Sequence, residues 1–211
     1  MKRVAFIPIR MNSKRVKNKN VRVLKGRPLF CWAAETLDKL NIPVYIYTNS
    51  EDILSACLDF NPRNITFLHR PEHLDSDKTK GIDIYQQFAK DIPADIYLLA
   101  HCTSPFVSEN TYRVMLDSVK CLPHKSALTV EKIQTFAWYE KKPLNFELPR
   151  IQTQLLKPVI IETSAAYVYK RDVVEGGTRS CDFPKLVETK YPETIDIDTE
   201  EDLRIAEDVK L

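Results

Sequence analysis

A basic and polar run between residues 7 and 20 holds the first side chains that could do chemistry. Its polar members include Arg10, Asn12, Ser13, Lys14, Lys19 and Asn20. The run follows residues 4–9, which are typical of a β-strand, and ligands of open α/β sheets bind at the carboxyl ends of the strands. Backbone N–H groups, together with serine and lysine side chains, can bind a polyphosphate there. Because Gly26 is the first glycine of the chain, the run cannot form a GxxxxGK[ST] phosphate-binding loop.

The charge around this run is one-sided. No acidic residue precedes Glu35, and the same stretch holds ten lysines and arginines, although the net charge of the chain is only +2. Such a local positive field attracts nucleotide phosphates, nucleic acid or a membrane surface, and a solvated basic face is the alternative. Nucleic-acid-binding modules interleave aromatic residues with the charges, whereas Phe6 is the only aromatic residue between Lys2 and Lys25. This composition favours a phosphate ligand over a nucleic acid.

Ile195-Asp196-Ile197-Asp198 is the second candidate site. Alternate side chains of a β-strand share a face, so the carboxylates of Asp196 and Asp198 would point the same way on a strand. Two neighbouring carboxylates repel each other unless a cation lies between them, and Mg²⁺ prefers such oxygen ligands. In the alternative interpretation, Asp198 caps the last helix and Asp196 is an exposed turn residue. An Asp-x-Asp pair is a weak signal, so the residues taken alone favour this second interpretation.

The third candidate site follows the apolar run at residues 96–100. His101, Thr103 and Ser104 stand where this predicted strand would open into the same crevice. A lone histidine is more often a satisfied structural residue, and only its position at the end of a strand favours contact with a ligand.

Apolar runs of strand and helix period alternate along the chain. Strands are predicted over residues 4–9, 44–48, 65–68, 96–100, 127–130, 159–169, 185–188 and 194–197. Helices are predicted over residues 29–40, 51–60, from a turn at 75–77 to 92, from a Ser108 cap to 122, and from Thr199 onward. This alternation predicts an α/β fold with a mostly parallel sheet and helices on both faces. A length of 211 residues fits one domain over residues 1–211.

Residues 134–158 break this alternation. They carry aromatic residues and prolines without a clean period, among them Phe136, Trp138 and Phe146. Exposed aromatic patches are typical of interfaces, so an extended arm that packs on a second subunit is one interpretation. An ordered loop that packs on its own domain is the other.

Cysteine usage and hydropathy indicate the compartment. The five cysteines are odd in number and widely spaced, without a CxxC pair, which predicts reduced thiols in a cytoplasmic protein. No apolar run approaches the ~20 residues of a membrane helix, and the N-terminus shows no signal-peptide core. We therefore expect a soluble protein without a membrane partner.

In this order the segments resemble the acylneuraminate (CMP-sialic acid synthetase-like) cytidylyltransferase family, which has the 3-deoxy-manno-octulosonate enzymes as relatives. The resemblance rests on residues 7–20, Arg70-Pro71, residues 75–77, Thr103-Ser104-Pro105 and the IDIDTEEDL segment at 195–203. It implies a Rossmann-like sheet of nucleotidyltransferase type, with a dimerisation arm at residues 134–158 and hence a homodimer. It also implies transfer of CMP from CTP to the anomeric hydroxyl of an acidic sugar, which releases pyrophosphate and serves surface polysaccharide or glycan biosynthesis.

The functional positions of the family fall on particular residues of this chain. The resemblance implies that CTP is bound by Arg10, Asn12, Ser13, Lys14, Lys19, Asn20, Arg70 and Thr79, with Lys19 and Arg10 catalytic. It implies that the sugar is bound by His101, Thr103, Ser104 and Thr163, and that Mg²⁺ is bound by Asp196 and Asp198. Transfer of a nucleotidyl group needs mainly positioning and charge neutralisation, which a lysine and Mg²⁺ can provide.

The chain departs from the family pattern at three places. Asn12-Ser13 replaces a Gly-Ser pair, which still allows the turn because asparagine tolerates left-handed geometry. His101 replaces a glutamine beside the sugar, and residues 134–138 and 162–164 lack the usual lysine and Asn-Gly. The nucleotide half therefore matches better than the sugar half, and the identity of the sugar stays open. The alternatives are a glycosyltransferase with Asp196-Ile197-Asp198 as its metal motif, a nucleic-acid-binding module, and a pseudoenzyme that binds CTP without turnover.

Overall fold

The computed structural model describes residues 1–10, 18–50, 53, 62–147 and 149–210. The predicted helix over residues 51–60 lies almost entirely outside the described residues, as do the predicted CTP-binding residues Asn12, Ser13 and Lys14. Within the described ranges, no helix is both long enough and apolar enough to cross a membrane.

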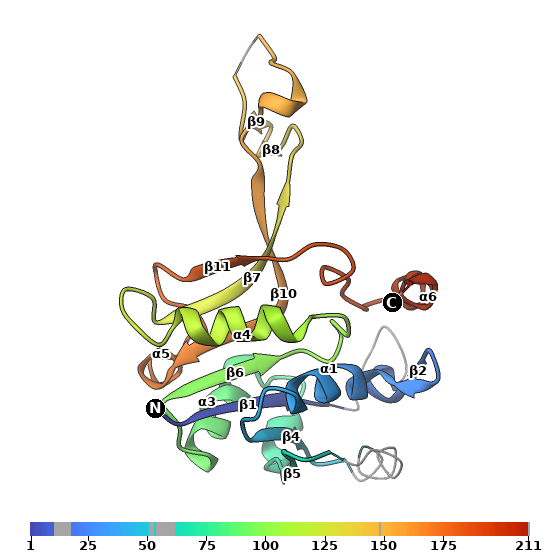
Figure 1. Ribbon diagram of the computed structural model, residues 1–211, viewed down its shortest axis with the longest axis vertical. Coiled ribbons are helices and arrows are strands. Elements are labelled where there is room, and N and C mark those ends of the chain that lie inside the picture. Colours follow the sequence, from blue (N-terminus) through green and yellow to red (C-terminus); the bar gives the residue numbers. More distant parts are fainter. Residues whose placement is uncertain (11–17, 51–52, 54–61, 148, 211) are drawn as a thin grey trace.

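A seven-stranded mixed sheet forms the centre of the molecule, in the order β11-β7-β10-β6-β1-β4-β5 (Figure 1). Its strands are β1 Arg3–Pro8, β4 Val44–Thr48, β5 Ile65–His69, β6 Ile96–Ala100, β7 Ser126–Ile133, β10 Val159–Lys170 and β11 Lys185–Glu188. β10 runs antiparallel to β6 and β7, and the other neighbouring pairs are parallel. The predicted mostly parallel α/β sheet is confirmed.

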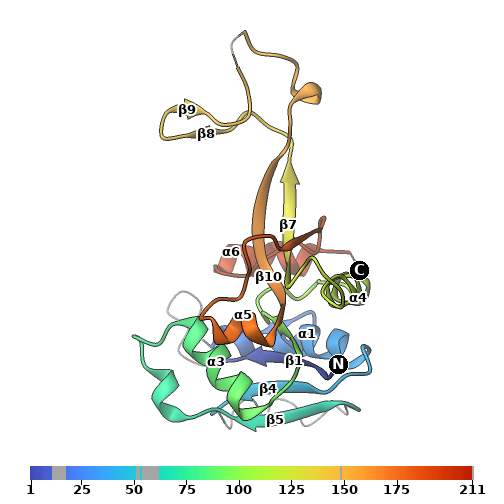
Figure 2. The same cartoon turned by 90° about the vertical axis from the view of Figure 1, so that its left-hand side faces the viewer.

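β7 and β10 extend beyond the sheet and form the two sides of an arm (Figure 2). Residues 134–158 connect them and include β8 (Trp138–Tyr139), β9 (Lys142–Pro143) and η3 (Thr153–Leu155). The rings of Phe136 and Trp138 pack edge-on against Phe146, with centroid distances of 5.0 and 5.2 Å. The arm projects away from the sheet, so other apolar side chains on it stay uncovered: Tyr139 is 65% exposed and Leu155 is 68% exposed.

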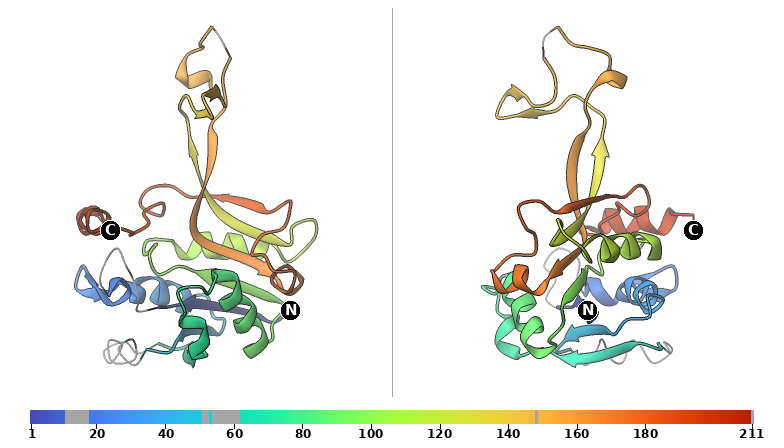
Figure 3. Two further views of the ribbon diagram at one scale, coloured as in Figure 1. Left: turned by 180° about the vertical axis from the view of Figure 1, so that it is seen from behind. Right: turned by 60° about the vertical axis from the view of Figure 1, so that its left-hand side comes forward.

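Helices cover both faces of the sheet (Figure 3). They are α1 Leu29–Asp38, α3 Gly81–Asp91, α4 Glu109–Ser118, α5 Arg171–Glu175 and α6 Glu200–Asp208. Ala5 and Ile7 of β1 pack in one buried cluster with α1 and α4, whereas Val4 and Phe6 pack in a second cluster with α3 and α5. This alternation of side chains along β1 is what a strand buried on both faces requires.

α6 brings the end of the chain beside the basic N-terminal segment. Its residues Leu203 and Ala206 share a third buried cluster with Leu24, which lies on β2 (Val23–Leu24), the partner of β3 (Arg27–Pro28). On the surface nearby, the Arg22 guanidinium donates to both carboxylate oxygens of Glu200, at 2.9 and 3.0 Å.

One predicted boundary and one predicted element are wrong. The helix predicted from a turn at residues 75–77 to residue 92 is present but starts later, at Gly81, where the Lys80 N–H donates to the Asp83 carboxylate at 2.8 Å. The strand predicted over residues 194–197 is an irregular segment, since the backbone N–H of Ile197 bonds to the Thr103 carbonyl (2.8 Å) and no strand that the structure describes pairs with it. The Ser108 and Thr199 caps are confirmed, with N–H groups three residues later donating to each hydroxyl.

Candidate active site

A cavity of about 300 Å³ opens where β1 and β6 end. These strands are parallel neighbours, so their carboxyl ends meet at the same edge of the sheet. The cavity is lined by Pro8, Arg10, Asn20, Thr79, Gly81, Ile84, Tyr85, His101, Cys102 and Thr103. Five predicted site residues therefore share one cavity, namely Arg10, Asn20, Thr79, His101 and Thr103.

Hydrogen bonds fix the described end of the N-terminal basic run to this cavity. The Arg10 guanidinium donates to the Thr79 carbonyl (3.1 Å), and the Asn20 amide donates to the Arg10 carbonyl (2.6 Å). The Cys102 thiol donates to Asn20 Oδ1 (3.1 Å), and burial raises the pKa of this thiol to about 12. Cys102 is therefore a neutral donor at neutral pH and not a nucleophile.

Lys19, which precedes the cavity-lining residue Asn20, meets Asp198, although the two lie 179 residues apart in sequence. The Lys19 ammonium is 2.8 Å from Asp198 Oδ1, and the exposed fractions of the two side chains are 13% and 36%. Thr199, and not Asp198, provides the side-chain cap of α6. Asp198 adjoins the cap, since its backbone N–H donates to the Asp202 carboxylate (3.0 Å), but its side chain pairs with Lys19 and does not cap the helix.

One carboxylate oxygen of Asp196 lacks a partner in the described part of the chain that would offset the cost of its burial. Its Oδ1 is buried and has no hydrogen-bond partner among the described residues. A buried unpaired carboxylate oxygen is costly, and a cation is what would satisfy it. No group of three or more His, Cys, Asp or Glu side chains with a metal-binding arrangement occurs in the described ranges. Asp196 and Asp198 therefore fit a hard divalent ion that takes its remaining oxygens from a bound ligand or water, as Mg²⁺ does.

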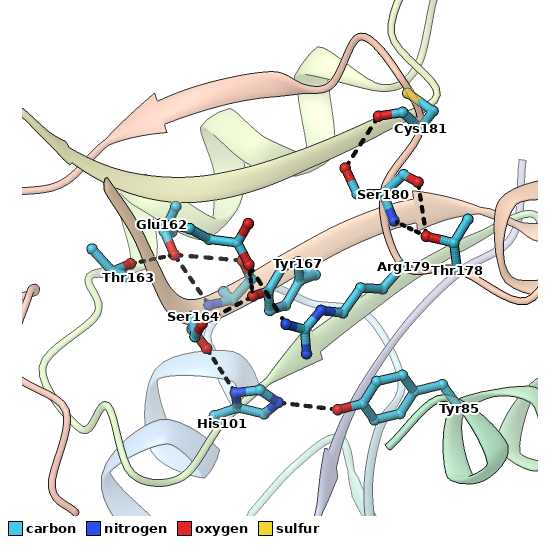
Figure 4. Close-up of polar contacts among 12 residues, drawn as sticks. Tyr85, His101, Glu162, Thr163, Ser164, Tyr167, Thr178, Arg179, Ser180 and Cys181 are labelled. Atoms are coloured by element: carbon cyan, nitrogen blue, oxygen red, sulfur yellow. Dashed lines mark hydrogen bonds and ion pairs between the residues drawn. The ribbon is translucent and has the colours of Figure 1, made fainter. Parts of the chain in front are cut away.

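His101 is held in one tautomer by a distortion of β10. The register of β10 against β7 shifts between Glu162 and Tyr167, and Ser164 has a left-handed φ of 58°. This bulge turns the Ser164 carbonyl toward His101, whose Nδ1–H donates to it at 2.6 Å (Figure 4). Nε2 is then the acceptor, and the Tyr85 hydroxyl donates to it at 3.3 Å. Burial lowers the pKa of His101, so the ring is neutral at neutral pH.

Six of the predicted site residues that the structure describes do not line the cavity. They are Lys19, Asp196 and Asp198, described above, and Arg70, Ser104 and Thr163. The Arg70 side chain is fully buried and donates to the Tyr47 carbonyl and the Asp75 carboxylate, so it positions the 70–79 segment without reaching the cavity. Ser104 is buried, and the Thr163 hydroxyl donates to Thr129 on β7 at 2.7 Å.

Sequence reasoning missed four residues of this region. Tyr85 packs in the core on the buried face of α3, and its hydroxyl reaches His101. Gly81 leaves it room, because a Cβ there would lie 3.0 Å from the Tyr85 oxygen. Glu162 and Arg179 meet beside Tyr85 and His101, and only the Gly176-Gly177 turn before Arg179 could have drawn attention to it (Figure 4).

Known proteins with similar sequences belong to one family of enzymes. The family model described as cytidylyltransferase matches residues 4–174, which is most of the chain. The chain belongs to the cytidylyltransferase family. An N-acylneuraminate cytidylyltransferase of Oncorhynchus mykiss is 27% identical over 96% of this chain and 49% of its own length. One of Streptococcus agalactiae serotype V is 26% identical over 69% of this chain and 34% of its own length. The chain thus spans half or less of the length of these relatives.

Solved structures of cytidylyltransferases share the fold. A CMP:2-keto-3-deoxy-manno-octonic acid synthetase complexed with CTP superposes with a TM-score of 0.70 at 17% identity, covering 98% of this chain and 97% of the other. The 4-diphosphocytidyl-2C-methyl-D-erythritol synthase of Anaerococcus prevotii gives a TM-score of 0.68 at 15% identity, covering 98% and 94%. The resemblance expected from the sequence motifs and the nucleotidyltransferase type of the fold are confirmed.

Proposed function

We propose that this protein transfers CMP from CTP to the anomeric hydroxyl of an acidic sugar and releases pyrophosphate. The observation that supports it most is the position of Arg10 in the cavity at the ends of β1 and β6, with the Lys19–Asp198 pair and Asp196 close by. Lys19 and Asp196 lie near enough to act on the pKa of the lining residues His101 and Cys102, and Asp196 Oδ1 has no hydrogen-bond partner among the described residues. Cations beside a cavity at this edge suit a triphosphate. The products would supply glycan or surface polysaccharide synthesis in the cytoplasm, where CTP is available.

The chain's own residues would act mainly by position and charge. The acceptor oxygen forms a bond to the α-phosphorus while the bond from that phosphorus to the β-phosphate oxygen breaks, and the hydroxyl proton is lost to solvent. Lys19 would offset the charge that develops on the α-phosphate oxygens, and Arg10 would hold the phosphates. Thr79 and Asn20 would contact the nucleoside side, with Arg70 as a buried support of the Thr79 segment.

Asp196 and Asp198 would hold Mg²⁺. When bound, this ion supplies charge neutralisation for the triphosphate. Asp198 also holds the Lys19 ammonium beside the cavity at 2.8 Å, so one carboxylate orders both the lysine and the cation site. On the acceptor side, His101 and Thr103 line the cavity and would contact the sugar.

CTP should stabilise the protein more than other nucleotides do. A ligand that binds only the folded state raises stability in proportion to the logarithm of its concentration over its Kd. Thermal unfolding with CTP, UTP, ATP and GTP at equal concentrations should therefore give the largest rise in Tm for CTP. Equal rises with all four would contradict a cytidine-selective site.

Pyrophosphate release separates this function from its alternatives. The protein, CTP and Mg²⁺ would be incubated with N-acetylneuraminate, 2-keto-3-deoxy-manno-octonate and neutral hexoses. We expect release only with an acidic sugar. A glycosyltransferase would consume a CMP-sugar and form a glycoside without releasing pyrophosphate. A pseudoenzyme would bind CTP without releasing pyrophosphate. A nucleic-acid-binding module would bind an oligonucleotide, with an affinity that falls as the salt concentration rises.

The arm should form the interface of a symmetric homodimer. Its exposed apolar side chains, which include Trp138 and Leu155, have no cover within the described chain, and a two-fold dimer is the commonest closed assembly. Light scattering at micromolar concentration should give twice the chain mass. Trp138→Ser together with Leu155→Ser should give a monomer, whereas Leu122→Ser, at a 75% exposed position outside the arm, should not. A monomeric wild type would contradict the dimer.

A further inference from the structure

Arg179 lies beside the cavity wall, next to two of its lining residues, but is not itself among them. Its guanidinium carbon is 4.0 Å from the centroid of the Tyr167 ring, and its Nη2 is 3.5 Å from Glu162 Oε1. Figure 4 shows its side chain extending from its own loop toward His101 and Tyr85, the two residues that line the cavity on this side.

The charge of Arg179 reaches the cavity lining. Burial is the largest influence on both neighbours, because it raises the pKa of Tyr85 and lowers the pKa of His101. The Arg179 cation lowers the pKa of both groups, which requires that it lie near them. His101 is neutral, so the positive charge near these two residues comes from Arg179, together with Arg10 beside Tyr85 and Lys19 beside His101.

The loop that carries Arg179 is held in place from both ends. It leaves α5 through Gly177, whose φ of +81° favours glycine. The Thr178 hydroxyl accepts from the Ser180 backbone N–H (3.2 Å) and donates to the Ser180 carbonyl (3.0 Å). Beyond it, the Cys181 N–H donates to the Ser126 hydroxyl of β7 at 2.9 Å. The arginine therefore projects from a fixed backbone and loses little conformational freedom when it binds an anion.

Glu162 is a weak and replaceable partner for this arginine. The ion pair is long, at 3.5 Å, and its side chains are 37% and 44% exposed. Exposed pairs of this kind contribute little to stability. Glu162 Oε1 also accepts from the Tyr167 hydroxyl, so the carboxylate keeps a donor if Arg179 turns away. The planar guanidinium, stacked on Tyr167, then presents its N–H groups to a second carboxylate, the geometry that arginine favours.

We propose that Arg179 binds the carboxylate of the acceptor sugar and that Glu162 is the internal anion which this carboxylate displaces. The inference rests on the proposed function, because it assigns a specificity residue to the acceptor side of that site. The inference requires that the acceptor carry a negatively charged group near the hydroxyl that reacts. In the competing hypothesis, the Arg179–Glu162 ion pair only stabilises the position of the loop after α5 against β10.

The two accounts differ in the sign of the Glu162 effect. If the Glu162 carboxylate competes with the substrate for Arg179, Glu162→Gln should lower the acceptor KM by about two- to five-fold. This factor corresponds to the free energy of one exposed ion pair. Arg179→Gln should raise the acceptor KM by about 10- to 100-fold, as expected for a charged hydrogen-bonded pair, and Arg179→Lys should fall between. The KM for CTP should change less than about two-fold in each variant. If the pair is only structural, both glutamine variants should weaken acceptor binding and lower Tm together.

The experiment combines kinetics with calorimetry. Acceptor KM would be measured with CTP and Mg²⁺ for wild type, the Glu162 and Arg179 variants, and Arg113→Gln, a control arginine that pairs with Glu109 on α4. N-acetylneuraminate and its methyl ester would be compared as acceptors, and their Kd values would be measured with CTP bound and Mg²⁺ replaced by Ca²⁺. The ester should bind wild type about as weakly as N-acetylneuraminate binds Arg179→Gln.

Equal affinity for the acid and its ester, an unchanged Kd in Arg179→Gln, or no binding of the acid would overturn the role of Arg179. Wild type that binds the acid through Arg179 but releases no pyrophosphate would refute the proposed transfer and leave the carboxylate site standing. If the Arg179 variants do not fold, two measurements still test the inference. They are the Kd values of the acid and its ester for wild type, and the acceptor KM of Glu162→Gln.

Discussion

Replacing Lys19 with alanine is expected to lower kcat by about 100-fold or more, the loss typical for one preorganised electrostatic donor. The Lys19 ammonium is only 13% exposed and is held at 2.8 Å from Asp198, beside the cavity. A charge ordered in this way can act on a transition state without further reorganisation. The KM for CTP should change less than kcat, because the developing charge exists only in the transition state.

Lys25→Ala is the matched control for this variant. Lys25 belongs to the same basic stretch, but it bonds to the backbone of Glu207 at the end of α6. Its loss should leave kcat unchanged. The Tm of Lys19→Ala should fall by no more than a few degrees, since one partly exposed ion pair is lost. Turnover that survives in Lys19→Ala would assign the charge stabilisation to another residue.

The second large effect is expected at the two aspartates. Activity should depend wholly on Mg²⁺ or Mn²⁺, and EDTA should abolish it. Asp198→Asn and Asp196→Asn should each lower turnover by about 100-fold or more, because each removes a hard oxygen ligand of the cation. Asp117→Asn, which breaks an exposed pair with Lys120, should keep wild-type turnover.

The same variants should differ in the stability of the metal-free protein. Asp196 Oδ1 is buried without a hydrogen-bond partner among the described residues, so Asp196→Asn removes a poorly compensated charge and should hold or raise Tm. Asp198 pairs with Lys19, so Asp198→Asn should lower Tm slightly, by about 2–4 °C if the pair is worth about 1 kcal/mol. Thermal unfolding with EDTA measures both. Full turnover of either variant with metal present would rule out the metal role.

Much of the fold could be predicted from the sequence because its strands are short apolar runs of distinct period. β4, β6 and β11 begin and end where the apolar runs do. A parallel sheet then brings the polar residues that follow β1 and β6 to the same edge. The joining of Arg10, Asn20, His101 and Thr103 in one cavity follows from those two facts.

The remaining features depend on contacts that no local pattern encodes. Ile195–Asp198 alternates like a strand, yet a strand needs a partner, and none of the described strands pairs with it; the Ile197 N–H bonds instead to the Thr103 carbonyl. Arg70 was expected to reach a ligand, but its burial depends on how Asp75 packs against it. Arg179 lies in an aperiodic loop, and its position beside His101 arises from the β10 bulge and the Gly177 turn.

The fate of CTP labelled at its α-phosphorus tests the central claim most directly. With Mg²⁺ and an acidic sugar, the label should appear in a CMP-sugar, with one pyrophosphate released for each sugar activated, and the label should stay in CTP when the sugar is omitted. Label that remains in CTP with every acidic sugar, or that is released as free CMP or CDP at a rate independent of the sugar, would contradict cytidylyl transfer at this site.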